Sequence, residues 1–148
     1  MNQEILEQTL RTIEQELNDP SFSESFYWVN QLLDDAGEEQ LVERLDYAIP
    51  ETWSWKVVGS LFGILSWSMS DNGSALLRTT EGWLREGTNL RRIQIALLQD
   101  TFPFRDANEM FRVLEGIAQR FPEVADTCQE WITWRHEHIL NRGPADPA

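Results

Sequence analysis

Cysteine, histidine and basic side chains are scarce in this sequence. Its 148 residues include one cysteine, two histidines and 12 Lys/Arg against 25 Asp/Glu, giving a formal net charge of −13. The lone cysteine, Cys128, cannot form an internal disulfide, so we expect the protein to occupy a reducing cytoplasm. Phosphate binding needs a basic patch, so this charge argues against a nucleic acid or an anionic membrane as the partner.

A long apolar run is missing too. The most apolar stretch, residues 52–70, has only 10 clearly apolar residues among its 19 and contains Lys56 and five serines. Because a membrane-spanning helix needs about 20 predominantly apolar residues, we do not expect this stretch to span a bilayer. Residues 1–17 are acidic and amphipathic, so a conventional signal peptide is not expected either.

The residues most often used as metal ligands or nucleophiles are poorly spaced. His136 and His138 lie two positions apart on a predicted helix and therefore point about 200° away from each other, which prevents a shared metal. Cys128 would need a nearby base to act as a nucleophile, yet His136 lies roughly 12 Å further along the same helix. We therefore expect Cys128 to be a small buried apolar side chain, and we expect neither a metal nor a cofactor.

Glu81 is the one acidic residue next to an apolar stretch, within residues 79–83. A carboxylate desolvated in this way can act as a general base, but it more often pairs with an arginine, and Arg78 and Arg85 lie within helical reach. The sequence contains no Gly-rich phosphate loop and no dinucleotide fingerprint. We expect no enzymatic activity; an enzyme that uses Glu81 or residues 136–138 is the competing interpretation.

Apolar residues recur at helical spacing along nearly the whole chain, and no segment of useful length alternates with a period of two. This pattern predicts an all-α fold of about eight antiparallel helices, in a single domain over residues 1–141 with a disordered tail at 142–148. The predicted helices cover residues 2–18, 22–36, 41–49, 52–70, 75–86, 89–102, 107–121 and 122–139. The last of them is expected to turn inward Val124, Cys128, Trp131, Ile132, Arg135 and Ile139.

Residues suited to capping mark three of the helix starts. Ser21 with Glu24, and Asp106 with Glu109, have the spacing of a capping box, and Thr88 is a natural N-cap. These residues predict helices that begin immediately after positions 21, 88 and 106.

The helix at residues 52–70 is expected to be buried at the centre of the fold, because two adjacent apolar stripes cover most of its circumference. One stripe comprises Trp53, Val57, Leu61, Ile64 and Trp67, and the other comprises Trp55, Val58, Phe62, Leu65 and Met69. Gly59 and Gly63 on the remaining arc would let a neighbouring backbone approach closely. Both Leu61→Ala and Gly63→Leu are therefore expected to destabilise the fold, the second through overpacking.

Helix pairs that begin near residues 22, 52, 88 and 123 recur at about 30–36 residues, which is typical of stacked helical hairpins. Over residues 22–141 this spacing resembles HEAT-like α-solenoid proteins, although the chain shares helical pattern rather than residue motifs with them. The tetratricopeptide Trp/Gly/Tyr/Pro pattern is absent. The resemblance implies that the chain binds other proteins.

Most of the excess negative charge lies in residues 1–51, where 13 acidic residues face only Arg11 and Arg44. Such a concentration suits either a solvated face or a surface that docks a basic partner. Five arginines between positions 78 and 105 are expected to neutralise acidic helices within the fold; the alternative is a rod with one acidic and one basic end. The residues predicted to bind a partner are Asp34, Asp35, Glu38, Glu39, Glu43, Asp46, Tyr47 and Trp28.

These features predict a non-catalytic, acidic, cytoplasmic protein-binding module whose partner has a basic surface. In size, charge and tryptophan content, the chain is similar to bacterial immunity-type proteins, which cover basic toxin or effector surfaces. The alternative is a structural or regulatory subunit, or a chaperone-like adaptor, of a larger assembly. A pattern of residues does not distinguish these classes, because they differ in the identity of the partner.

Overall fold

Helices account for all the regular secondary structure in residues 1–19 and 21–142, which are the residues that the computed structural model describes. The eight helices are α1 (Gln3–Gln15), α2 (Ser23–Ala36), α3 (Leu41–Ala48), α4 (Trp55–Ser68), α5 (Ser74–Glu86), α6 (Leu90–Leu97), α7 (Ala107–Arg120) and α8 (Pro122–Arg142). The all-α prediction is confirmed for these residues. None of the described helices is both long and apolar enough to cross a membrane. Apart from position 142, which ends α8, the predicted tail lies outside the described residues.

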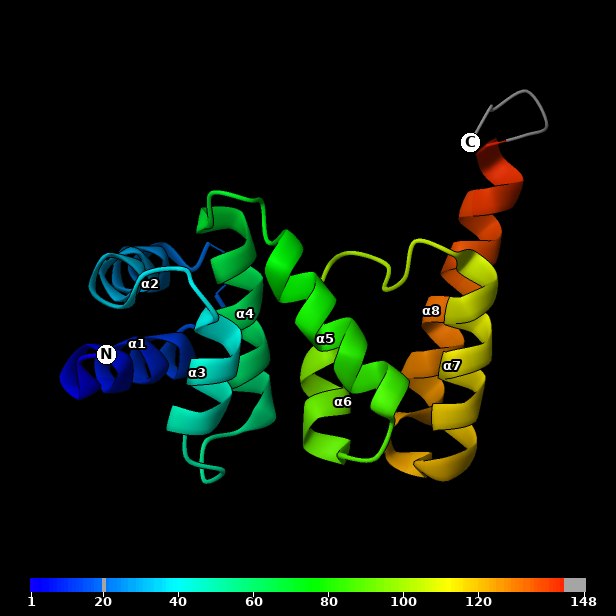
Figure 1. The fold of residues 1–148 in the computed structure, drawn as a ribbon, viewed down its shortest axis with the longest axis horizontal. Helices are drawn as coiled ribbons and strands as arrows, with labels where there is room; N and C mark the ends of the chain where they lie inside the picture. Colours follow the sequence, from blue (N-terminus) through cyan, green and yellow to red (C-terminus); the bar gives the residue numbers. More distant parts are fainter. Residues whose placement is uncertain (20, 143–148) are drawn as a thin grey trace.

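The helices follow one another from α1 and α2 at one end of the molecule to α7 and α8 at the other, with α5 and α6 between them (Figure 1). One hydrophobic cluster draws on α1 to α5 together with Ile95 of α6, and a second joins Leu84 of α5 to α6, α7 and α8. The most extensive packing is between α1 and α2, α5 and α6, and α7 and α8. The packed pairs are therefore offset by one helix from the pairs predicted to begin near residues 22, 52 and 88.

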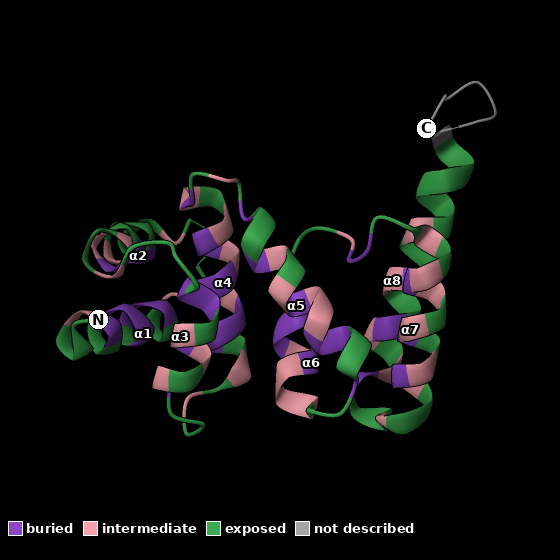
Figure 2. Ribbon diagram, viewed as in Figure 1, coloured by how far each residue is buried: buried purple, intermediate pink, exposed green. Residues whose placement is uncertain are grey.

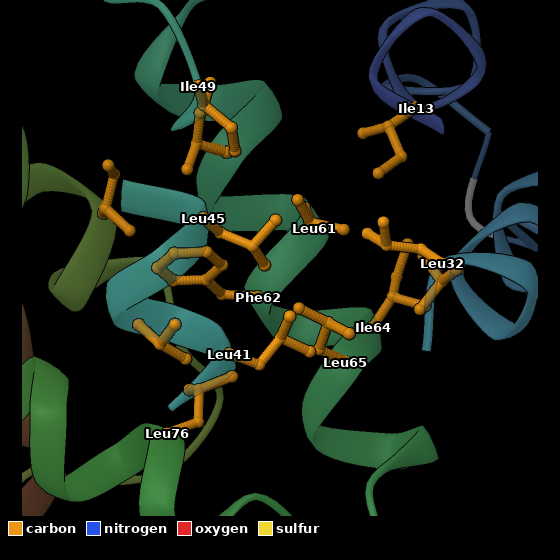
Figure 3. Close-up of a cluster of buried hydrophobic side chains, with 14 of the residues drawn as sticks. Ile13, Leu32, Leu41, Leu45, Ile49, Leu61, Phe62, Ile64, Leu65 and Leu76 are labelled. Atoms are coloured by element: carbon orange, nitrogen blue, oxygen red, sulfur yellow. The ribbon is translucent and has the colours of Figure 1, made fainter. Parts of the chain in front are cut away.

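α4 is buried along the two predicted stripes (Figure 2). Leu61 and Ile64 lie toward Ile13 of α1 and Leu32 of α2, whereas Phe62 lies among Leu41, Leu45 and Leu76 (Figure 3). All of these side chains belong to the first hydrophobic cluster, and all are buried. Trp67 is the exception to the prediction: it was assigned to the first stripe, but 75% of its surface is exposed.

The small-residue arc of α4 has a close neighbour at Gly59 and not at Gly63, and that neighbour is the side chain of Leu98 rather than the expected backbone. A Cβ atom added to Gly59 would lie 2.5 Å from Leu98 Cδ2, at the end of α6, whereas one added to Gly63 would meet nothing within 4 Å. The expectation that Gly63→Leu overpacks the fold is therefore wrong. Gly63 is left uncovered because α6 ends at Leu97, and the next residue, Leu98, lies against Gly59 at the other end of the arc.

Gly59→Ala is accordingly expected to be less stable than Gly63→Ala by up to about 1 kcal/mol, since only in the first must the partly exposed side chain of Leu98 shift to admit the added methyl group. Both changes give α4 the same gain in helix propensity, roughly 1 kcal/mol, so the difference isolates the packing term. Urea unfolding of the two variants followed by circular dichroism measures it. Equal unfolding free energies would show that α4 and α6 do not meet closely at Gly59.

Two of the three predicted helix starts differ in detail from the structure. Ser21 does not cap α2; its hydroxyl bonds Asp19, and Glu16 of α1 accepts from the Ser25 N–H at 2.7 Å, in the first turn of α2. α6 is capped by Asn89, whose side chain accepts from the Arg92 N–H at 3.1 Å, and not by Thr88. Asp106 does cap α7, as predicted.

Candidate protein-binding surface

The acidic residues on and before α3 are partly committed to contacts within the fold. Glu38 Oε1 accepts from the Ser70 N–H at 2.8 Å, and Glu43 Oε1 accepts from the Thr79 hydroxyl at 2.7 Å. Asp46 Oδ2 pairs with Arg92 Nη2 of α6 at 2.6 Å. These residues are thus not a purely solvated face: Glu38 ties the loop before α3 to the loop after α4, Glu43 ties α3 to α5, and Asp46 ties α3 to α6.

A cleft of about 620 Å³, here called the α3 cleft, lies between the end of α3 and α6. Its lining includes residues of the loops that follow α3 and α5. The apolar part of the lining comes from α3 to α6 and the loop after α3, and the charged part comes from α3 and that loop on one side and from α6 on the other. The lining residues are Glu43, Asp46, Tyr47, Ile49, Pro50, Glu51, Val58, Trp83, Asn89, Arg91, Arg92 and Ile95.

The arginines of the α3 cleft already have partners. Arg91 Nη1 donates to the Trp53 carbonyl at 2.7 Å. Arg92 pairs with Asp46, and its guanidinium carbon lies 5.3 Å from the centre of the Trp83 ring. Each guanidinium therefore spends part of its hydrogen-bonding capacity inside the fold, and the lining also carries the carboxylates of Glu43 and Glu51 and the phenol of Tyr47.

Tyr47 projects into solvent at the rim of the α3 cleft, with 94% of its surface exposed. An aromatic side chain this exposed contributes little to the stability of the chain that carries it, but it is a common anchor in protein interfaces. The structure thus places the predicted residues Glu43, Asp46 and Tyr47 around one concave site.

The negative charge around α3 is mostly not neutralised by arginine. Within the described residues only Asp46, among the six acidic residues predicted to bind a partner, takes part in an ion pair. Arg44, the nearest base in sequence, donates instead to the carbonyls of Gly37 and Glu39, so it orders the loop between α2 and α3. Neutralisation within the fold therefore accounts for one acidic residue of this region, and the remaining charge faces solvent.

Two further predicted residues lie elsewhere. Trp28 packs edge-to-face against Tyr27 at 5.4 Å on α2, and it does not line the α3 cleft. Asp35 accepts from the Asn2 N–H at 2.7 Å, which places it beside the start of α1. Asp34 and Glu39 are exposed. Of the eight predicted residues, Glu43, Asp46 and Tyr47 therefore line the α3 cleft, and Trp28 and Asp35 lie apart from it.

Glu81, the candidate general base, has a structural role. Its Oε1 accepts from the Phe104 N–H at 2.9 Å, and Phe104 holds a left-handed φ of +65° in the loop between α6 and α7. Arg85 pairs with Glu109 at 3.0 Å, so neither the expected Glu81–arginine pair nor a Glu109 capping box is observed. Glu81 and Arg85 together hold the α6–α7 loop against α5.

Cys128 is fully buried, as predicted, and burial raises the pKa of its thiol to about 11. The thiol is therefore protonated at neutral pH, whereas a nucleophilic cysteine needs its thiolate. His136 stacks on Phe111, with the ring centres 4.0 Å apart, and is exposed. Among the described residues, no three His, Cys, Asp or Glu side chains gather closely enough to hold a metal ion.

Comparison with known proteins returned no match. No protein-family model matches the chain, and no curated protein or solved structure matches it at a significant level.

Proposed function

We propose that this protein is a non-catalytic module that binds a basic protein partner through the acidic surface around α3. The observation that carries the proposal is Tyr47, almost fully exposed at the rim of an acid-bordered cleft whose two arginines are already bonded within the fold. A lysine or arginine of the partner would enter this cleft beside Glu43 and Glu51, and Tyr47 would supply a desolvated aromatic contact.

An immunity-type protein that neutralises a basic toxin or effector in the cytoplasm is the form of this function that the charge favours most. Negative charge concentrated on one side speeds association with a basic surface, which is what neutralisation of a toxin requires. A HEAT-like stacking of antiparallel hairpins would suit the same role, since stacked helices offer an extended surface for a protein partner.

A structural or regulatory subunit, or an adaptor, is the second candidate. The observation in its favour is a separate exposed apolar area around Trp67 on α4, because an adaptor needs a second binding surface. Tandem affinity purification from the native host separates the two: one basic toxin domain supports the first, and a fixed multi-subunit complex supports the second.

The acidic surface is tested by reversing charges that have no role in the fold. In the variant Glu39→Lys/Glu51→Lys, association with the purified partner is expected to slow by about tenfold or more at low salt, and its salt dependence to flatten. Stopped-flow mixing over a range of ionic strength measures both. Glu38 and Glu43 are left unchanged, because their hydrogen bonds to Ser70 and Thr79 would also be lost.

The matched control is Glu123→Lys/Asp126→Lys on the exposed face of α8, which changes the net charge by the same amount far along the chain. If both double variants slow association equally, the partner senses only the overall charge, and the α3 surface is not the binding site. Tyr47→Ala adds an independent check, since it should raise the dissociation rate without altering the charge.

A further inference from the structure

A second concave surface runs along the side of α4 that carries Gly59, Gly63 and Trp67. One hollow of about 330 Å³ is lined by Phe22, Phe26, Gly59, Ser60, Gly63, Ile64, Trp67, Leu98 and Asp100. A neighbouring hollow of about 370 Å³ shares Trp67 and Asp100 with it and continues over the start of α5. We call the two together the Trp67 groove.

The walls of the Trp67 groove are large apolar side chains that face solvent. Trp67 is 75% exposed, Leu98 40% and Phe26 36%, and these three come from α4, the end of α6 and α2. Small residues, Gly59, Ser60 and Gly63, form the floor of the groove. No atom lies within 4 Å of a Cβ added to Gly63. Exposed apolar residues that converge on a hollow mark a binding site more often than scattered ones do.

The Trp67 groove lies on a different side of α4 from α3. At 100° per residue, the centre of the arc of Gly59, Gly63 and Trp67 lies about 130° from the centre of the stripe of Phe62 and Leu65 that packs toward α3. No residue lines both the Trp67 groove and the α3 cleft. An occupant of the groove would therefore leave the α3 surface free.

The charge in the lining of the Trp67 groove is negative. The segments that line it, residues 22–26, 59–77 and 98–101, contain Glu24, Asp71 and Asp100. The pKa of Asp71 is lowered by the hydrogen bond from the Ala75 N–H and also by the charge of Arg78, which directly follows the second segment. Asp100 is the one charged residue in the lining itself, and it belongs to both hollows. A second copy of the chain is a poor occupant, because each copy carries a net charge of −13.

We propose that the Trp67 groove binds a short amphipathic helix of a partner protein, with the apolar face of that helix against Trp67, Leu98 and Phe26 and a lysine or arginine beside Asp100. From Gly63, beyond the part of α4 that Leu98 covers, to Trp67 the α4 surface runs for about 6 Å, roughly one helical turn, and the neighbouring hollow continues the groove over the start of α5. Helices bind such grooves through apolar anchors at i, i+3 or i+4, and i+7. Open space over Gly63 lets the bound backbone come close to α4.

A labelled peptide tests the proposal. The probe is a fluorescein-labelled, helix-forming peptide of about 14 residues with leucines at i, i+3, i+4 and i+7 and lysines on the opposite face. A scrambled peptide of identical composition, with the leucines spread around the helix, has the same charge. We expect fluorescence anisotropy to give a dissociation constant at least about tenfold lower for the amphipathic peptide than for the scrambled one.

Three substitutions locate the binding. Trp67→Ala removes the main wall, Gly63→Leu fills the floor, and each should weaken peptide binding by about tenfold or more. Asp100→Lys should weaken it by a smaller factor that shrinks as salt rises. The matched control is Gly82→Leu on α5, where a side chain also meets nothing within 4 Å but lies outside the groove, and it should bind as the wild type does.

Several results would overturn the proposal. If the amphipathic and scrambled peptides bind with equal dissociation constants, only their charge is recognised. If Gly63→Leu and Trp67→Ala bind the amphipathic peptide as tightly as the wild type does, the peptide binds outside the groove. A dimer seen by light scattering that Trp67→Ala dissociates would make a second copy the occupant. In Glu39→Lys/Glu51→Lys, the dissociation constant for the peptide should stay within about twofold of the wild-type value. A failed proposal for the α3 surface can therefore be told apart from a failed proposal for the groove.

Discussion

Replacing Leu61 by alanine is expected to lower the free energy of unfolding by about 2–5 kcal/mol. Leu61 has no exposed surface and lies at the middle of α4, on the side that packs toward α1 and α2 (Figure 3). Helices enclose it, so the space left by the side chain cannot be filled by a small movement of a loop. Urea unfolding followed by far-ultraviolet circular dichroism measures the loss, with an unchanged m value as the test of two-state behaviour.

Trp67→Ala is the control for this prediction, because it removes a larger side chain from the same helix. Since three quarters of Trp67 is exposed, the change should alter the unfolding free energy by only about 0.5 kcal/mol. Equal losses in Leu61→Ala and Trp67→Ala would mean that the stripe through Leu61 is not the core. The same Trp67→Ala measurement also shows that a loss of peptide binding in that variant does not come from unfolding.

The buried faces of α4 were predictable from the sequence because burial of a helix leaves a periodic pattern in the residues themselves. Val57 and Leu61 on one stripe, and Phe62 and Leu65 on the other, recur at helical spacing and are all buried. Trp67 continues the first stripe by position, yet it is exposed. Whether the last apolar residue of a stripe is covered depends on where a distant helix ends, and periodicity within α4 carries no such information.

The α6–α7 loop was not predictable for a related reason. The first proline after α6 is Pro103, so the helix was expected to run to about residue 102 rather than to end at Leu97. Phe104 is buried and has a left-handed φ. Its N–H donates to the carboxylate of Glu81, 23 residues earlier in the chain. Partners so remote in sequence are supplied by the fold and not by local propensity.

The acidic surface was likewise predictable only in part. The concentration of acidic residues predicted a charged face at residues 34–46, and the arginines at positions 78–105 were expected to neutralise acidic helices. Among the described residues of this region, only Asp46 is paired with an arginine. The sequence did not predict that Asp46 would meet Arg92, which is 46 positions away, or that Glu43 would meet Thr79. Tyr47 was identified as a nearby aromatic, but the cleft beneath it requires α3, α5 and α6 to be placed together.

The inward face predicted for α8 is correct for Arg135 and wrong for Ile139. α8 has 21 residues against 14 in α7, so its last turns extend past the helix that it packs against, and Ile139 is 45% exposed (Figure 1). Arg135 lies before this overhang. Its Nη1 donates to the carbonyls of Pro103 and Phe104 at 2.9 and 2.7 Å, and its Nη2 donates to that of Arg105 at 2.9 Å.

Arg135→Ala is expected to lower the free energy of unfolding by roughly 2–4 kcal/mol, because one guanidinium satisfies three consecutive carbonyls of a loop without regular structure. Burial lowers the pKa of Arg135 and the charge of Asp106 opposes this shift, but an arginine side chain stays protonated in proteins, so the three hydrogen bonds are charge-assisted. The guanidinium carbon also lies 5.5 Å from the centre of the Phe102 ring, and this contact is lost with it.

Hydrogen exchange gives the sharper readout for Arg135→Ala, since the amides of residues 98–106 should exchange faster while those of α1 and α2 do not change. Arg112→Ala, on the exposed face of α7, removes the same charge and should leave stability within about 0.5 kcal/mol. The unfolding free energy of Arg135→Lys should lie between those of Arg135→Ala and Arg112→Ala, because an ammonium group lacks the planar fork that reaches three carbonyls. If Arg135→Ala matches Arg112→Ala in both measurements, the loop is held by Glu81 and by burial of Phe104, and the guanidinium is dispensable.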